Sequence, residues 1–311
     1  MGGIFFAILK SARPRQWLKN LALFTTALIT GHVFEPNVLY ASFIGFLSFC
    51  LLSSSNYIFN DVMDEKRDKK HPFKRFRPVA SGSLPVPFAI AASIVLVISG
   101  LALSRTLGTS FFFLSIVFIF LEYLYTVFFK HISVIDILAI TAAYFIRVYA
   151  GEAATGFHIS VWLALAALSL ALFLAIGKRR AELTLMQGFK GTASDTRSSL
   201  SHYSEKLLDT YTAMFANSTF ITYCFYTFLE RPAKIGFFFL GYNDFASDIP
   251  ERKWMMISIP FVLYGIMRYM QLIYEGKGES PEQVLTSDMP LLATVLLWTL
   301  SVFIIVYGIG G

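Results

Sequence analysis

The sequence predicts an all-α, polytopic membrane protein with nine transmembrane helices in one bundle. Of its 311 residues, 56% are apolar and only 15% are charged, whereas a soluble domain carries about 25% charged residues. The mean hydropathy is +0.61. The apolar residues also gather in segments of the roughly 20 residues that cross a bilayer. Together these observations exclude a water-facing globular protein.

The expected transmembrane segments follow one another along the whole chain. A short interfacial helix over residues 3–16 is expected first, because Lys10, Arg13 and Arg15 stand beside apolar side chains. No stretch has the composition of a soluble domain, so we expect a single transmembrane domain over residues 1–311. The nine expected spans cover residues 18–34, 38–59, 86–104, 109–129, 133–151, 160–177, 207–229, 254–274 and 289–309.

Loops rich in lysine and arginine alternate with loops that have few of them, and this alternation indicates how the spans are oriented. The segment before the first span and the loops after spans two, four, six and eight carry 19 basic residues, and the other loops carry five. The positive-inside rule places the N-terminus and the two long basic loops in the cytoplasm and the C-terminus outside. We therefore expect a multi-pass protein of the cell (inner or plasma) membrane. The net charge of +6 favours anionic ligands over nucleic acid.

A group of acidic residues stands where the second span reaches the cytoplasm: Asn60, Asp61, Asp64 and Asp68. On a helix the three carboxylates fall within about 60° of one another. Like charges on one stripe repel, and a divalent cation bound through oxygens, with a substrate phosphate completing its shell, explains the arrangement. The alternative is a solvated face on which the interleaved charges of residues 65–70 pair with the acids.

Basic residues follow this acidic group at once. Lys74, Arg75 and Arg77 precede the small-residue turn 80–82. Arginine offers forked donors to phosphate oxygens, and glycine lets the backbone approach them, so this segment is a candidate phosphate-binding loop. The alternative is topology alone, because any cytoplasmic loop is rich in lysine and arginine.

The second long basic loop begins with the run Gly177-Lys178-Arg179-Arg180-Ala181-Glu182. Lys178 and Arg179 are candidates for binding phosphate, and Glu182 is a candidate for reaching a metal ion. The positive-inside rule alone also explains three consecutive cations at a helix end. A local ion pair is the alternative for Glu182.

The remaining candidates have weaker signals. Tyr125 and Lys130 end the fourth span on the cytoplasmic side, where either could be an interface anchor. The five histidines lack metal-ligand spacing, so no zinc site is proposed. The two cysteines, Cys50 and Cys224, are expected to be small buried apolar residues.

Four ionisable residues lie within the spans or at their rims: Glu122, Asp136, Arg147 and Arg268. Such residues are costly in lipid and are usually functional or paired. Asp136 lies near the cytoplasmic end of the fifth span, and Arg147 lies roughly 16 Å deeper. We expect Arg147 to be structural and to pair with Glu152.

Nine spans with Asn60-Asp61-x-x-Asp64-x-x-x-Asp68 after the second resemble the UbiA-type prenyltransferase superfamily of intramembrane helical enzymes. In that superfamily the first acidic motif holds Mg²⁺ against a diphosphate, and a second Asp-rich motif normally follows the sixth span. Here the second position reads Lys178-Arg179-Arg180-Ala181-Glu182, with one acid where the aromatic prenyltransferases have at least two.

In this second motif the sequence resembles the branch that includes decaprenyl-phosphate phosphoribosyltransferase. Members of that branch have a Gly-Lys-Arg-x-Ala-Glu-Leu run at this position. The resemblance extends from the first basic segment to the ninth span. It is carried further by Ser11-x-Arg13-Pro14-x-Gln16-Trp17-x-Lys19-Asn20, His71-Pro72-x-Lys74-Arg75-x-Arg77-Pro78, Tyr125, Lys130, Arg147 and Gly278-Glu279-x-Pro281-Glu282.

The resemblance implies a Mg²⁺-dependent transfer of a 5-phosphoribosyl group from phosphoribosyl diphosphate to a polyprenyl (decaprenyl-type) phosphate, for cell-envelope biosynthesis. The metal ligands would be Asp61, Asp64 and Asp68, and Asp61, Asp64 and Glu182 would be catalytic. The lipid phosphate is already an anion, so no strong general base is required. The expected substrate-binding residues are Asn60, Lys74, Arg75, Arg77, Tyr125, Lys130, Lys178 and Arg179.

Substrate charge favours this branch independently. A prenyl diphosphate with a neutral aromatic acceptor presents one diphosphate, whereas phosphoribosyl diphosphate with a lipid phosphate presents three anionic groups. More anions call for more cations and fewer carboxylates, as in the run 178–182. An aromatic prenyltransferase is the nearest alternative. A transporter is a further one, although the charged motifs lie at helix ends rather than near the midplane. A homo-oligomer is left open.

Overall fold

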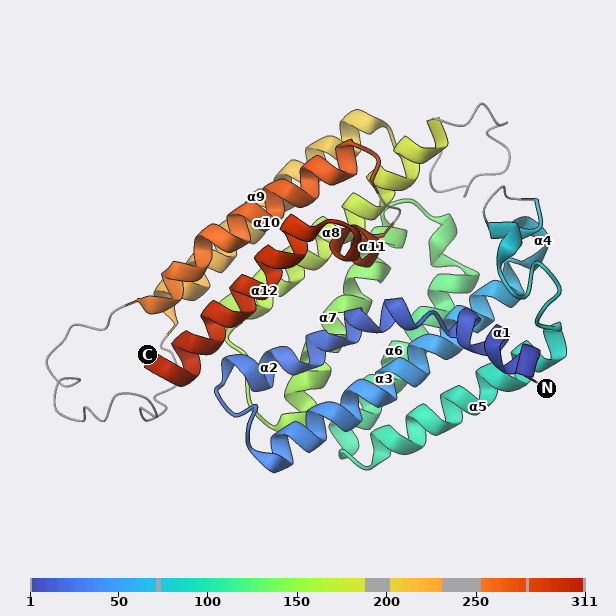
Figure 1. Ribbon diagram of the computed structural model, residues 1–311, viewed down its shortest axis with the longest axis horizontal. Coiled ribbons are helices and arrows are strands. Elements are labelled where there is room, and N and C mark those ends of the chain that lie inside the picture. The colour runs from blue at the N-terminus through green and yellow to red at the C-terminus, as the bar shows by residue number, and fades with distance from the viewer. Residues whose placement is uncertain (1, 71–73, 188–201, 231–252, 278–279, 310–311) are drawn as a thin grey trace, which may run out of the picture. The chain divides into compact units, whose positions relative to one another are not determined.

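The computed structural model of the protein describes residues 2–70, 74–187, 202–230, 253–277 and 280–309. Within these ranges every regular element is a helix, which confirms the predicted all-α class (Figure 1). The chain divides into two compact units. Unit 1 comprises Met1–Phe24, Tyr40–Thr155 and Lys190–Tyr203, and unit 2 comprises Thr25–Leu39, Gly156–Phe189 and Ser204–Gly311. The single domain over residues 1–311 stays a prediction.

Four long helices and several short ones belong to unit 1. Its elements are α1 (Gly2–Ala12), η1 (Pro14–Leu23), most of α3 (Pro36–Met63), α4 (Glu65–Asp68), η2 (Lys74–Phe76), α5 (Val86–Arg105), α6 (Thr109–Val127), η3 (Phe129–His131) and α7 (Ile135–Thr155). The expected interfacial helix corresponds to α1, on which Phe5 and Phe6 are exposed.

Unit 2 is built around α8 and α9, which pack along one another. Its elements are most of α2 (Phe24–Ile29), α8 (Val161–Gln187), α9 (Glu205–Leu229), η6 (Trp254–Ser258), α10 (Ile259–Tyr274), α11 (Pro281–Ser287), α12 (Met289–Phe303) and η7 (Ile304–Ile309), a π-helical turn.

Seven helices in the described part of the chain are long and apolar enough to cross a membrane. They confirm seven of the nine predicted spans, and the count of nine stays a prediction. Much of their surface is exposed apolar side chain, such as Ile94 and Ile98 on α5, as lipid-facing helices require. The seven are Pro36–Met63, Val86–Arg105, Thr109–Val127, Ile135–Thr155, Val161–Thr184, Trp254–Tyr274 and Met289–Gly308.

The expected first span falls on two elements, the ten-residue η1 of unit 1 and the six-residue α2, most of which belongs to unit 2. Each is shorter than the roughly 20 residues that cross a bilayer, so this span stays a prediction. Within unit 1, η1 lies directly on α7, because a Cβ added to Gly151 would come within 2.3 Å of the carbonyl oxygen of Leu23. Only glycine at position 151 permits this approach.

The expected seventh span is α9, which has 25 residues and is long enough to cross a bilayer. Its side chains are more polar than those of the seven apolar helices. The hydroxyls of Thr212, Thr219 and Thr222 bond to carbonyls one turn earlier, which satisfies them within the helix. Such internal pairing lowers the cost of threonine in an apolar environment.

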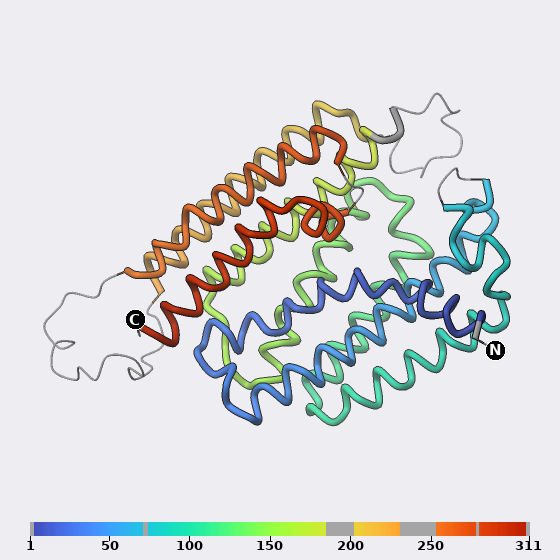
Figure 2. The backbone as a smooth tube through the Cα atoms, viewed as in Figure 1, coloured from blue at the N-terminus to red at the C-terminus, as the bar shows by residue number. Residues whose placement is uncertain are grey.

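Small residues join α3 to α5, which run side by side in Figure 2. The Ser48 hydroxyl donates to the Gly100 carbonyl at 2.9 Å, and the Ser55 hydroxyl donates to the Ser93 carbonyl at 2.9 Å. A Cβ on Gly100 would meet Leu52 at 2.9 Å, so these helices are in close contact. Nearer the end of α3, Ile58 packs in an apolar cluster with Ala7, Val79, Leu84 and Ala89. This cluster seats α1 and the turn after η2 beside the acidic residues.

Candidate active site

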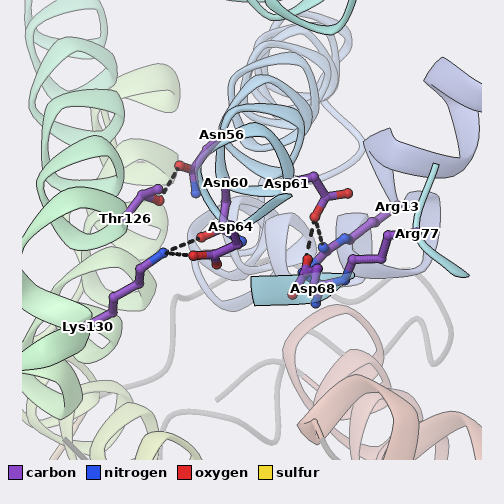
Figure 3. A network of polar contacts seen from close by, with 9 residues as sticks. All are labelled: Arg13, Asn56, Asn60, Asp61, Asp64, Asp68, Arg77, Thr126 and Lys130. Carbon is purple, nitrogen blue, oxygen red and sulfur yellow. Dashed lines mark hydrogen bonds and ion pairs between the residues drawn. The ribbon is translucent and has the colours of Figure 1, made fainter. Parts of the chain in front are cut away.

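The helix α3 ends at Met63, just before the second of the three predicted carboxylates. Asp64 has φ −94° and ψ 3°, and the short helix α4 begins after it. Asp61 and Asp68 therefore lie on one side of this junction, whereas Asp64 lies on the other with Asn60 (Figure 3). The prediction of a single stripe was wrong, because it assumed an unbroken helix through residue 68.

Arginines bind the carboxylates of Asp61 and Asp68. Arg13 donates from Nη2 to Asp61 Oδ1. Arg77 Nη1 lies 2.7 Å from Asp68 Oδ2 and 3.3 Å from Asp61 Oδ1, so one guanidinium bridges both acids. Arg13 adopts a left-handed conformation with φ 52° immediately before η1, and its guanidinium also lies over the ring of Tyr57. Arg13 was absent from the predicted site, and its place in the motif of residues 11–20 was its only signal.

Lysine binds the carboxylate of Asp64. Lys130 Nζ lies 2.7 Å from Asp64 Oδ1 and 3.3 Å from Asn60 Oδ1. Lys130 is on η3 and is 2% exposed, so its charge is withdrawn from water. The structure thus brings a predicted phosphate-binding lysine to the predicted acidic motif. We call Asn60, Asp61, Asp64 and Asp68, with Arg13, Arg77 and Lys130, the acidic cluster (Figure 3).

Three other predicted residues lie on elements next to the acidic cluster in sequence. Lys74 is half-buried on η2, and Arg75 is exposed there with its guanidinium 4.8 Å from the ring centroid of Phe76. Tyr125 is half-buried near the end of α6. The loop histidine, His71, lies outside the described residues. Substrate binding by these residues stays a prediction.

A buried polar network extends from the acidic cluster into the span region of unit 1. Asn56, one turn before Asn60 on α3, donates to Glu122 at 2.7 Å and accepts from Thr126. Arg147, which we expected to pair with Glu152, lies 3.6 Å from Glu122. Its guanidinium also donates to Asn20 at 2.8 Å and to a backbone carbonyl of α7. These contacts agree with the structural role expected for Arg147.

The oxygen donors of the acidic cluster fit a hard divalent cation. Asp61 is 1% exposed, and its Oδ2 is buried without a hydrogen-bond partner in the part of the chain that the structure describes. Among the described residues, no three histidine, cysteine or carboxylate side chains converge on a common metal position. Mg²⁺ is usually bound through one or two carboxylates, with waters and substrate phosphates as its other ligands. The donor set therefore suits Mg²⁺.

The last third of α8 carries the second predicted motif, in unit 2. Arg179 is fully buried, and its Nη1 lies 2.5 Å from Glu182 Oε2. A Cβ on Gly177 would lie 2.7 Å from Cδ1 of Ile273 and 3.0 Å from the ring of Tyr269, so α10 packs closely against α8 here. Lys178 is half-buried. The predicted local ion pair of Glu182 is thus present.

Arg180 joins three helices of unit 2. Its Nε donates to Asp209 at 2.7 Å, and its Nη2 lies 3.5 Å from Glu205, both on α9. The guanidinium also lies 5.2 Å from the ring centroid of Tyr274 on α10. These contacts assign Arg180 a structural role. We call Lys178, Arg179, Arg180 and Glu182, with Glu205 and Asp209, the basic cluster.

The other ionisable residues that the sequence indicated are also paired. Arg268 on α10 binds Asp288 through two nitrogens, at 2.7 and 3.2 Å. Asp288 caps α12 by accepting from the backbone of Leu291, and the hydrogen bonds from Arg268 hold the pKa of its carboxyl below the ordinary value. Asp136, at the start of α7, accepts from the hydroxyl of Tyr203 at 2.7 Å.

Comparison with known proteins agrees with this architecture. The model of the UbiA prenyltransferase family matches residues 21–184. The decaprenyl-phosphate phosphoribosyltransferase of Corynebacterium glutamicum is 32% identical over 305 residues, covering 96% of this chain and 86% of that protein. The protein of the same name from Mycobacterium tuberculosis is 32% identical over 300 residues, covering 95% of this chain and 92% of the relative.

Solved structures are similar in fold across almost the whole chain. A UbiA homolog from Archaeoglobus fulgidus bound to GPP and Mg²⁺ matches with a TM-score of 0.70 at 18% identity, covering 96% of this chain and 100% of that one. The same homolog bound to Cd²⁺ matches with a TM-score of 0.67 at 19% identity. At this identity the likeness shows the fold, and both neighbours hold a divalent metal.

Proposed function

Because the chain belongs to the UbiA prenyltransferase family, we propose that it transfers the 5-phosphoribosyl group of phosphoribosyl diphosphate to a polyprenyl phosphate, releasing diphosphate. Relatives that are about 32% identical over nearly the whole chain are named for this activity with a decaprenyl phosphate. The chain is a multi-pass membrane transferase, with a bilayer around its apolar helices.

The observation that carries this proposal is the acidic cluster, in which three cations oppose three carboxylates. Carboxylates alone would repel two anionic substrates. The arginine and lysine side chains balance them and provide forked and point-charge donors for phosphate oxygens. We assign phosphate binding to Arg77 and Lys130 on this ground, and to Lys74, Arg75 and Tyr125 by their position on neighbouring segments.

The ion that would occupy the acidic cluster is Mg²⁺. The proposed ligands are Asp61, Asp64 and Asp68, with Asn60 contributing its amide oxygen. Because these carboxylates do not converge on one position in the described part of the chain, a bound ion would take one or two of them, with waters and substrate phosphates as its other ligands. Bound Mg²⁺ supplies a Lewis acid that stabilises the negative charge developing on the departing diphosphate. The buried Asp61 Oδ2, without a hydrogen-bond partner among the described residues, supports this assignment.

The reaction itself asks little of a general base. The bond between ribose C1 and the diphosphate oxygen breaks as a lipid phosphate oxygen bonds to C1, which passes through oxocarbenium character. The attacking oxygen is already ionised, so no proton has to leave it. The chain's own residues must hold two anionic substrates in alignment. Such alignment supplies a large part of many enzymatic rate enhancements.

The basic cluster supplies the second proposed set of residues. Arg179 and Lys178 would bind phosphate, and Glu182, which lies 2.5 Å from Arg179, is the proposed catalytic carboxylate of this set, a candidate for reaching a metal ion. Arg179 contacts Glu182 through Nη1, and the planar guanidinium group has a fork of donors that suits phosphate oxygens. The orientation of the chain, with the N-terminus and both clusters cytoplasmic and the C-terminus outside, is proposed from the distribution of basic residues.

An assay with two substrate pairs tests the proposed function. Purified protein is given phosphoribosyl diphosphate with decaprenyl phosphate, or a prenyl diphosphate with an aromatic acid, each with Mg²⁺ and with EDTA. We expect phosphoribosylated lipid and diphosphate from the first pair alone, and none after chelation. Turnover of the second pair alone would contradict the proposal and identify an aromatic prenyltransferase.

A further inference from the structure

Tyr203 is a buried residue that was absent from every predicted site. It precedes α9 by two residues in sequence but belongs to unit 1. Its hydroxyl donates to Asp136 Oδ1 at 2.7 Å and accepts from the backbone N–H of Val134 at 2.6 Å. The hydroxyl thus donates to the second residue of α7 and accepts from the residue just before this helix.

Val134 has an uncommon backbone conformation. Its φ is +69°, one of two positive values among the described residues other than glycine. A β-branched residue is a genuine outlier in the left-handed region, and such a conformation persists only when its surroundings hold it. The N–H of Val134 also lies at the N-terminus of a helix, where backbone donors lack partners within the helix. The Tyr203 hydroxyl supplies that partner.

The turn held in this way carries Lys130. Only two residues separate η3 from Val134, and the turn continues into α7, where the Asp136 N–H bonds to the Ile132 carbonyl at 3.0 Å. Asp136 is fully buried, and its Oδ1 also accepts from the N–H of Ile137. Because Val134 lies between η3 and α7, its backbone conformation sets the angle between these two elements. It thereby sets the place of Lys130 against Asp64.

We infer that Tyr203 is a positioning residue, whose hydroxyl holds the turn at Val134 and so keeps Lys130 on Asp64 and Asn60. The inference rests on the proposed function, because it gives Lys130 a role in binding substrate phosphate. Ring packing alone does not require that hydroxyl.

Amine labelling tests the inference without relying on catalysis. The full-length protein in detergent is treated with an N-hydroxysuccinimide ester, and labelling rates are read by peptide mass spectrometry at Lys130 and at Lys69, whose side chain is 54% exposed. In Tyr203→Phe we expect the rate at Lys130 to rise about tenfold or more while that at Lys69 is unchanged, because a hydrogen bond to a charged group is lost. Tyr40→Phe, which removes an exposed hydroxyl in unit 1, is the matched control.

Two results would overturn the inference. One is a Lys130 that stays as protected in Tyr203→Phe as in the wild type. The other is an equal rise at both lysines together with a lower thermal midpoint, which assigns the hydroxyl to general stability. If Tyr203→Phe does not fold, Asp136→Asn replaces it, because this variant weakens the acceptor and keeps its shape. The same selective rise, by about threefold, is then expected at Lys130.

Kinetics separate this inference from the proposed function. In Tyr203→Phe we expect the KM for phosphoribosyl diphosphate to rise about tenfold and kcat to stay within about twofold, as when binding common to the ground and transition states is lost. A wild-type protein without phosphoribosyl transfer would contradict the proposed function, whereas the labelling contrast would still decide the role of Tyr203. An unchanged KM beside a labelled Lys130 would overturn the role in substrate binding.

Discussion

The acidic cluster of unit 1 and the basic cluster of unit 2 reach charge balance in opposite ways. In the acidic cluster, α3, α4 and the residue between them carry the carboxylates, and the cations come from the segment before η1, from the residue after η2 and from η3. In the basic cluster, α8 carries the cations, and α9 supplies two of the three carboxylates. Under the proposed function, the first arrangement would offer carboxylate oxygens to a metal ion, and the second would offer guanidinium groups to phosphates. A similar balance of charge is thus built from helices that carry opposite charges.

The largest expected effect is loss of a carboxylate that we propose as a metal ligand in the acidic cluster. Asp64→Asn keeps the shape of the side chain but removes the charge that faces Lys130 at 2.7 Å. We expect kcat to fall at least about 100-fold, comparable with the loss of a group that stabilises developing charge. Initial rates at saturating phosphoribosyl diphosphate and Mg²⁺ measure this effect.

Glu65→Gln is the matched control, because Glu65 is the next residue and pairs with exposed Lys69 at 2.7 Å. It should retain wild-type rates. If Glu65→Gln lost as much kcat as Asp64→Asn, the effect would not be specific to the carboxylate at position 64. That result would contradict the comparison between the two clusters.

A smaller effect is expected in the basic cluster, where two adjacent arginines should differ. Arg179→Lys retains the charge but loses the fork, so the KM for phosphoribosyl diphosphate should rise about tenfold with little change in the thermal midpoint. Arg180→Lys should do the reverse, because Arg180 contacts Asp209 and Tyr274 rather than a proposed ligand. Steady-state kinetics give the KM of both variants, and thermal unfolding gives their midpoints. Identical profiles would contradict the division of roles.

The buried pair Arg147 and Glu122 should affect stability more than catalysis. Arg147→Met leaves Glu122 without its partner at 3.6 Å, and breaking a buried pair costs about 3 kcal/mol. Replacing both residues by methionine should recover part of this loss, because no unpaired charge then remains. Unfolding in mixed micelles measures the cycle, and a double variant that loses the sum of the single losses would exclude the coupling.

The smallest expected effect is pH-dependent and lies in unit 2. Hydrogen bonds from Arg268 lower the pKa of Asp288 below its ordinary value. A carboxyl whose folded-state pKa is lowered contributes stability above its unfolded pKa, near pH 4, and loses it as the pH falls through the folded pKa. Asp288→Asn should therefore lower the thermal midpoint slightly at pH 7 and by less at pH 3. An equal deficit at both values would refute this linkage.

Much of the site was predictable because chemistry and position in the sequence coincide there. Asn60, Asp64 and Lys130 were all expected at cytoplasmic ends of spans, and the structure brings them into contact. Arg13 and Asn56 were missed for different reasons. Arg13 had the appearance of a topology signal, and it meets Asp61 across 48 residues where Trp17 and the Ala12 carbonyl bond to Ser54 on α3. Asn56 is one polar residue within an apolar helix, without a local pattern to distinguish it.

The sequence by itself determined that the chain is a helical membrane protein and where its charged motifs lie. Apolar length and loop charge are local properties, and lipid admits only helices or closed barrels in the span region. Only the tertiary structure decided which charges meet. The end of α3 at Met63 separates Asp64 from Asp61, and helix packing brings Tyr203 to Asp136 across 67 residues. Side-chain pairing depends on where helices end and how closely they approach, and neither property is written in residue spacing.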